Sequence, residues 1–107
     1  MIKVENVLRV LGVETITNAK SGHPGVVLSG APIFYSIFKN LKVDISNPKY
    51  YNRDYFVCSA GHASSLLYAT MHLFNMGISI DDLKKFRKIN SITPGHPETE
   101  TPFIDCS

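Results

Sequence analysis

The sequence lacks most of the features that would assign a function at once. Its 107 residues include only two cysteines, Cys58 and Cys106, and no run of about 20 apolar residues that could span a membrane. Lys and Arg exceed Asp and Glu by 11 to 9 without clustering, which argues against a nucleic-acid partner. Lys3, Glu5 and Arg9 interrupt any apolar run at the N-terminus, so we expect no signal peptide. We therefore expect at most one folded domain, cytoplasmic, with reduced thiols and no membrane contact.

What the sequence does contain is a repeated glycine–histidine turn. His23 lies in Ser21-Gly22-His23-Pro24-Gly25, His62 follows Gly61, and His96 lies in Pro94-Gly95-His96-Pro97. Gly frees the backbone to approach a ligand and Pro fixes it, so each turn is expected to present one imidazole. The three imidazoles could be metal ligands, acid–base groups, or donors to an anionic or hydroxyl-bearing ligand.

Metal is the weakest of these interpretations. The histidines are 39 and 34 residues apart, which matches no compact zinc pattern, and no Cys or carboxylate lies at ligand spacing. We therefore predict no metal ligand in this chain. For any single histidine the simplest explanation is a hydrogen bond to a loop carbonyl, but the recurrence of the same turn at three places weakens it.

The apolar spacing predicts helices over residues 3–19 and 63–75, the second ending at Gly77. A helix between them is expected to start near Ser29 as its cap, with Pro32 in its first turn. Its wide apolar arc suggests burial on more than one side. Ser79 and Asp82 predict a capping box and a short helix to residues 86–88, followed by loop.

Tyr55-Phe56-Val57-Cys58 has strand composition and runs into the turn at Gly61. A buried strand followed by a glycine turn and a helix is the unit that α/β folds use to build ligand sites. Because a lone buried strand leaves its backbone groups unpaired, its sheet partners are expected to come from elsewhere, and the chain looks incomplete.

Other candidate side chains have simpler explanations. His72 is expected to pack within its helix or at an interface, and Cys58 to be a buried apolar residue and not a nucleophile. Glu98 and Glu100 read as solvated loop carboxylates. Three tyrosines could form a stacking surface but lack interleaved basic residues, so we expect core packing for Tyr50, Tyr51 and Tyr55.

Three blocks of the sequence resemble the first three signature blocks of the transketolase family, in order and at family spacing. They are residues 19–25 (AKSGHPG), 52–62 (NRDYFVCSAGH) and 93–98 (TPGHPE), and residues 83–87 fit the short helix of that family. The resemblance covers essentially the whole chain. It implies that residues 1–107 are the N-terminal part of a thiamin-diphosphate-binding domain, an α/β fold in which this segment is mostly helical with one clear strand.

The resemblance implies a thiamin-diphosphate transferase of the pentose phosphate pathway that moves a two-carbon ketol unit from a ketose phosphate to an aldose phosphate. By position, His23 and His96 match catalytic, substrate-binding histidines of the family, and His62 matches a cofactor-binding one. Imidazoles suit these roles because they donate hydrogen bonds and exchange protons near neutral pH. The implied partners are sugar phosphates and a second subunit, in a homodimer or as a separate chain.

The sequence departs from the family at several positions. Ala60 stands where the family usually has Asn, Ala63 where Gly is frequent, Glu14 where Asp is usual and Tyr55 where a basic residue is usual. By the resemblance, the remaining cofactor turn, the ligands of Mg²⁺ (or Ca²⁺) and the partner domain would lie beyond Ser107. The isolated chain is therefore expected to be inactive.

Alternatives stay open at this stage. A dihydroxyacetone synthase or a two-subunit transketolase would share these blocks, whereas a deoxyxylulose-phosphate synthase differs around the second and third. An alternative of another class is a non-catalytic, truncated interaction module, since exposed apolar faces imply partners.

Overall fold

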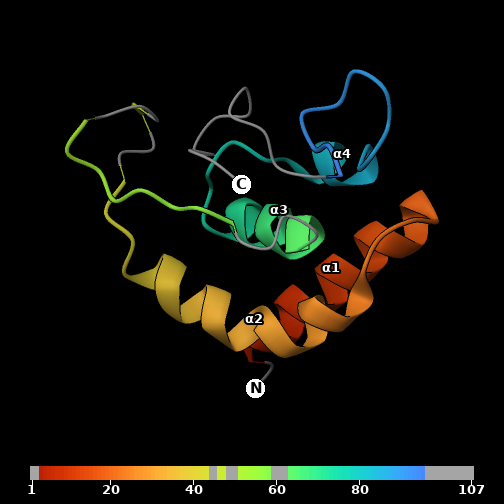
Figure 1. Cartoon of the computed structure of the whole chain (residues 1–107), viewed down its shortest axis with the longest axis horizontal. Helices are drawn as coiled ribbons and strands as arrows, with labels where there is room; N and C mark the ends of the chain where they lie inside the picture. Colours follow the sequence, from red (N-terminus) through yellow and green to blue (C-terminus); the bar gives the residue numbers. More distant parts are fainter. Residues whose placement is uncertain (1–2, 44–45, 48–50, 59–62, 96–107) are drawn as a thin grey trace.

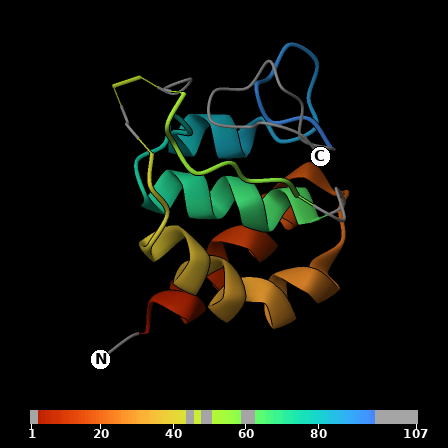
Figure 2. The same cartoon turned by 60° about the vertical axis from the view of Figure 1, so that its left-hand side comes forward.

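Helices dominate the part of the chain that the computed structural model describes, residues 3–43, 46–47, 51–58 and 63–95. In chain order the helices there are α1 (Val4–Ala19), α2 (Pro24–Lys39), α3 (Ser64–Leu73) and α4 (Ile80–Lys84). α3 lies in the middle, with α1 and α2 on one side of it and the shorter α4 on the other (Figure 1, Figure 2). The mostly helical character predicted from the sequence is confirmed.

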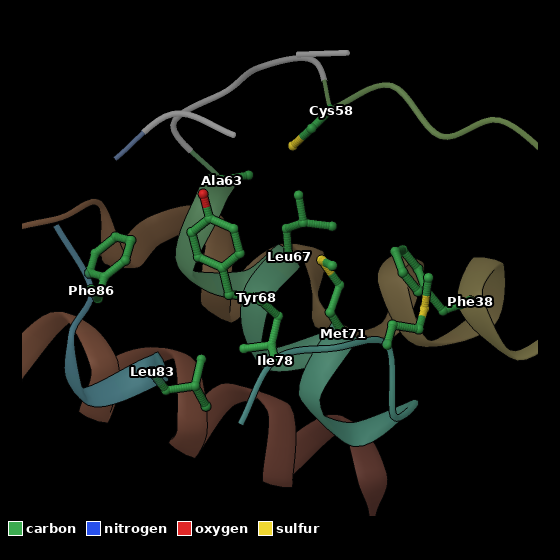
Figure 3. Packing of buried hydrophobic residues seen from close by; sticks show 10 residues of the cluster. Phe38, Cys58, Ala63, Leu67, Tyr68, Met71, Ile78, Leu83 and Phe86 are labelled. Atoms are coloured by element: carbon green, nitrogen blue, oxygen red, sulfur yellow. The ribbon is translucent and has the colours of Figure 1, made fainter. Parts of the chain in front are cut away.

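The core is built around α3, which is buried from Ser64 to Met71. One side of α3 packs on α1 and α2 through five buried residues: Leu8, Val27, Ala31, Leu66 and Ala69. Its other side packs on α4 and on the segments before α3 and on either side of α4 through a second cluster (Figure 3). This cluster includes Cys58, Leu67, Tyr68, Met71, Ile78, Leu83 and Phe86. A helix that is apolar all round belongs in an interior, and this burial makes α3 the element on which the others are positioned.

α1 and α2 cross closely at Gly12. A Cβ on this glycine would lie 2.5 Å from Val27 Cγ1, so only a residue without a side chain fits there. α1 ends at Ala19; the following Lys20 has a left-handed backbone (φ 56°), and the N–H of Ser21 donates to the carbonyl of Ile16 at 3.3 Å. This closure turns the chain sharply into the loop before α2.

The prediction that the second helix starts near Ser29 is wrong. α2 begins at Pro24, whose fixed φ and missing N–H suit the first helical position. Ser29 does not cap the helix; its hydroxyl donates back to the carbonyl of Gly25 at 3.3 Å.

Pro32 consequently lies inside α2 and not in its first turn. A proline in a helix interior has no N–H for the carbonyl four residues earlier, here that of Leu28. Arg9 of α1 supplies the missing donor, because its Nε lies 2.9 Å from the Leu28 oxygen. A side chain from one helix therefore completes the hydrogen bonding of the next.

The expectation that α2 would be buried on more than one side is met only in part: Val27 packs on α1 and Phe38 on Phe56, but other apolar residues of the helix stay exposed. Leu28, Ile33 and Ile37 are 51%, 61% and 42% exposed, respectively. Ile33 and Ile37, four residues apart, share one exposed stripe of the helix, whereas Leu28 lies on a different flank, where its carbonyl accepts from Arg9 of α1.

The prediction of a buried strand over residues 55–58 is wrong for the described chain: the segment forms no regular strand, and Tyr55 and Val57 are exposed. Single-residue β-bridges occur at Asn47 and Val57, and the described residues contain no longer ladder. Phe56 fixes the segment by packing edge-on against Phe38 of α2, with ring centroids 5.0 Å apart. A regular strand would need a neighbouring strand to accept its backbone hydrogen bonds.

α3 ends at Leu73, and the chain turns away at a left-handed Asn75 (φ 62°), with the N–H of Met76 donating to the carbonyl of Met71 at 2.8 Å. The predicted stop, Gly77, follows two residues later with φ 86°. The asparagine turns the chain first because it also tolerates this conformation.

The capping box of α4 is confirmed. Ser79 Oγ accepts from the N–H of Asp82 at 3.1 Å, and the Asp82 carboxylate accepts from the N–H of Ser79 at 2.9 Å. The helix ends at Lys84, earlier than predicted, and the chain turns again at Arg87, whose φ is 63°.

Candidate functional site

The loop before α2 carries the first candidate histidine. Gly22 has φ 142°, a conformation that L side chains rarely adopt, and a Cβ there would lie 2.7 Å from Ile16 Cγ1. His23 follows in an extended conformation at the cap position of α2, with its side chain exposed. The predicted form of this turn, a defined loop that presents one imidazole between two helices, is confirmed.

A second loop leads to the third candidate histidine, and its approach is tightly held. Thr93 is fully buried; its hydroxyl donates to the Asp82 carbonyl at 2.9 Å, and its own carbonyl accepts from the N–H of Arg87 at 3.0 Å. Tyr68 of the central helix donates its hydroxyl to the carbonyl of Pro94 at 2.7 Å. These bonds fix the chain directly before Gly95 and His96.

These two loops lie next to each other although they are far apart in sequence. Nη1 of Arg87 lies 2.9 Å from Ser21 Oγ, and Nδ2 of Asn18 donates to the carbonyl of Lys84 at 2.9 Å. A cavity of about 640 Å³ lies here, and its lining includes Ala19, Ser21, Arg87, Asn90, Pro94 and Gly95. The structure therefore brings the backbone before His23 and the backbone before His96 to one end of the helices.

The start of α3 offers donors without acceptors. Within the described part of the chain, the hydroxyl oxygens of Ser64 and Ser65 are buried without a hydrogen-bond partner, and no side chain caps the helix. Hydroxyls and free amides at a helix N-terminus are the groups that bind phosphate oxygens in proteins. This donor set fits a diphosphate in its chemistry, directly after Gly61 and His62 in the chain.

His62, His96, Glu98, Glu100 and Tyr50 lie outside the described residues. The roles of His23, His62 and His96, and their meeting at one ligand, therefore stay predictions. In the described ranges no group of three or more His, Cys, Asp or Glu side chains could hold a metal ion. None of the helices in those ranges combines the length and apolarity needed to cross a bilayer.

The other candidates divide into confirmed and wrong predictions. His72 is half-buried with Nδ1 2.9 Å from the carbonyl oxygen of Ile78, which confirms a packing role. Cys58 is buried as predicted, and this burial raises the pKa of its thiol, which disfavours the reactive thiolate. Tyr51 and Tyr55 were predicted in the core but are 83% and 61% exposed, because the turn that carries them lies outside the helix packing.

Sequence reasoning did not pair the residues that hold the two loops together. Arg87 ends the block 83–87 that fits the family's short helix, but nothing in the composition or spacing distinguishes it from the other Lys and Arg residues as a link between loops. Its partner Ser21 is 66 residues away in the chain, so only the folded structure pairs them.

Solved structures with the same fold are transketolases. The chain superposes on transketolase from Campylobacter jejuni with a TM-score of 0.89 at 45% identity, covering 94% of this chain and 16% of that one. It superposes equally well on Pichia stipitis transketolase in complex with sedoheptulose 7-phosphate, at 42% identity over 94% of this chain and 15% of that one. The fold is thus that of a segment of a thiamin-diphosphate-dependent enzyme.

Sequence comparison gives the family. Residues 2–107 match the family model described as the transketolase thiamine diphosphate binding domain. The chain is 50% identical to a probable transketolase of Streptococcus pneumoniae over 95% of this chain and 16% of the relative, and 47% identical to transketolase of Kluyveromyces lactis over 94% and 15%. This chain belongs to the transketolase family, and it spans about one sixth of the length of these relatives.

Proposed function

We propose that this chain is the N-terminal part of the diphosphate-binding domain of a transketolase. The complete enzyme transfers a two-carbon ketol unit from a ketose phosphate to an aldose phosphate. The observation that carries the proposal is the family match over residues 2–107. The adjacency of the loops before His23 and His96 supports it, because it brings together the backbone leading to two of the three matched histidines.

In this proposal His23 and His96 bind the sugar and move protons at its hydroxyl and carbonyl oxygens, and His62 binds the cofactor on its diphosphate side. His23 suits the task because its imidazole is exposed on a loop that Gly22 and Pro24 fix on either side. Thiamin diphosphate, when bound, supplies the carbanion chemistry, while the protein orients the substrate and handles its protons.

Ser64 and Ser65, with the free amides of the first turn of α3, would contribute donors to the diphosphate. Following the order of the family's sequence blocks, we assign the ligands of the divalent ion, Mg²⁺ or Ca²⁺, to residues beyond Ser107; among the described residues no group of three or more His, Cys, Asp or Glu could hold it. The proposed partners are sugar phosphates and a second subunit, in a homodimer or as a separate chain. The proposed location is the cytoplasm.

The test is ketol transfer in the complete enzyme that carries this segment, with thiamin diphosphate, Mg²⁺, sedoheptulose 7-phosphate as donor and an aldose phosphate as acceptor. Mass spectrometry follows the donor as it loses two carbons. His23→Ala is expected to lower kcat by at least about 100-fold, the usual effect of removing an acid–base group. His72→Ala, the matched control, should leave kcat unchanged, because the His72 ring bonds to a backbone carbonyl of its own chain. Equal kcat values for the two variants would contradict the role of His23.

The 107-residue chain by itself is expected to show no turnover in the same assay, and turnover by it would refute the assignment of essential parts to other residues. A second candidate function rests on the exposed apolar stripe of α2 formed by Ile33 and Ile37, which lie four residues apart. It is a non-catalytic module that pairs with another protein chain through this stripe. A cooperative, monomeric thermal melt of the isolated chain, together with an inactive complete protein, would favour the module.

A further inference from the structure

Arg87 connects the two loops that lead to candidate histidines. We propose that Arg87 is a positioning residue that holds the His23 loop and the His96 loop in one relative arrangement, an inference that rests on the proposed function. In this proposal Arg87 touches no reacting atom. It acts through Ser21 and Gly95, which precede His23 and His96 in the two loops.

The backbone of Arg87 is held in an unusual conformation. Its φ of 63° is one that residues with a side chain seldom adopt, and its N–H donates to the carbonyl of Thr93 at 3.0 Å. This hydrogen bond closes the loop and brings Gly95 back beside the arginine. Lys20, Asn75 and Asn90 share this positive φ, so the conformation marks a tight turn after α4, and the contacts of the guanidinium carry the proposal.

The guanidinium is oriented by three contacts. Nη1 lies 2.9 Å from Ser21 Oγ, and Cζ lies 5.5 Å from the ring centroid of Phe86, which is buried. On the remaining side, a Cβ on Gly95 would lie 3.0 Å from Nε and 3.1 Å from Cζ. Gly95 is therefore small because the guanidinium occupies the adjacent space.

An arginine suits this position better than a lysine. Its planar fork can donate to Ser21 while its flat face lies against Gly95, whereas a lysine ammonium is a compact charge without a face. Since the Arg87 side chain is exposed, its hydrogen bond adds little to stability. Its effect should instead appear in catalysis, because a misplacement of about 1 Å costs up to roughly 100-fold in rate.

The first test compares Arg87→Ala with the matched control Lys88→Ala, the adjacent exposed cation, in the complete enzyme. Arg87→Ala is expected to lower kcat by about 10- to 100-fold, with a smaller change in KM for the ketose phosphate and no change in the unfolding midpoint relative to Lys88→Ala. Ser21→Ala should lower kcat less, and should add nothing to Arg87→Ala. Additive losses, or a kcat equal to that of Lys88→Ala, would overturn the proposal, as would a loss of kcat that follows a lowered unfolding midpoint.

Gly95→Ala provides a compensation test. The new methyl group must displace the guanidinium by a few tenths of an ångström, so we expect a loss of kcat in the presence of Arg87 and no further loss in the Arg87→Ala background. Equal losses in both backgrounds would mean that the glycine serves another purpose and would count against the proposal.

Hydrogen exchange separates this inference from the proposed function. In the same complete protein, Arg87→Ala should raise amide exchange in residues 20–23 and at Gly95, whereas Lys88→Ala should not. If the wild-type protein transfers no ketol unit, the proposed function fails, and the exchange measurement still decides whether Arg87 holds the loops. Unchanged exchange in both segments would refute the positioning role.

Discussion

The bond between Arg9 and the carbonyl of Leu28 gives a prediction about how α1 and α2 stabilise each other. Pro32 leaves that carbonyl without its helical donor, and Arg9 Nε replaces the donor at 2.9 Å. We expect Arg9→Met, which keeps most of the aliphatic stem, to lower the free energy of unfolding. In a Pro32→Ala background the same change should have a much smaller effect, because an alanine at this position would supply the N–H itself.

The magnitude follows from the exposure of the bond. A hydrogen bond with a charged donor contributes about 1.5–3 kcal/mol when shielded from water. This bond is exposed to solvent, so water can take the place of Arg9, and we expect about 1 kcal/mol. For a chain of this size that corresponds to a fall in Tm of roughly 4 °C. Pro32→Ala alone should stabilise the protein, since a proline inside a helix costs about 3 kcal/mol where nothing compensates for it.

The assay is urea denaturation of the four proteins of the cycle, followed by far-ultraviolet circular dichroism. Arg9 also donates to Asn6 Oδ1 at 2.8 Å, so Asn6→Ala serves as the control for that second bond. A coupling free energy of about 0.5–1 kcal/mol is expected between positions 9 and 32. An equal cost of Arg9→Met in both backgrounds would refute the idea that the arginine compensates for the proline.

Three further predictions concern packing, capping and ionisation. Gly12→Ala should lower the free energy of unfolding by about 1–3 kcal/mol because its Cβ would meet Val27 Cγ1 at 2.5 Å, and the cost should shrink in a Val27→Ala background, as thermal denaturation can show. Ser79→Ala should cost about 1 kcal/mol by removing the capping box of α4, whereas Ser36→Ala, on the exposed side of α2, should not destabilise. Burial raises the pKa of the Cys58 thiol in the folded chain, so as the pH rises the thiol ionises earlier in the unfolded chain than in the folded one. The contribution of Cys58 to the free energy of unfolding should therefore be fully present below about pH 8.5 and be lost as the pH rises above that value, and Cys58→Ala should weaken this loss.

Each of these has a clear contrary result. An undiminished cost of Gly12→Ala beside Val27→Ala would place the crowding elsewhere. A Ser79→Ala variant as stable as the Ser36→Ala protein would mean that the capping box adds nothing. The same decline of stability at high pH in wild type and Cys58→Ala would assign that decline to other groups.

Local chemistry made several features predictable. The apolar spacing of residues 3–19 predicted α1, and Ser79 with Asp82 predicted the capping box, because both depend on residues within a turn or two of one another. The turn at Gly22 and His23 was predictable for the same reason. The start of α2 was not, since both Pro24 and Pro32 are acceptable first-turn residues, and the contact with Arg9 that offsets part of the cost of Pro32 inside the helix forms only in the folded structure.

The sequence by itself determined the family, the position of α1, the capping of α4 and the turn that carries His23, because each is written in neighbouring residues or in ordered blocks. The tertiary structure decided which distant segments meet. It alone placed Arg87 between Ser21 and Gly95, left Ile33 and Ile37 of α2 exposed, and buried the Ser64 and Ser65 hydroxyls at the start of α3, where the described part of the chain gives them no partner. Such contacts depend on how helices pack around α3, and packing between residues 66 positions apart leaves no periodic pattern in the sequence.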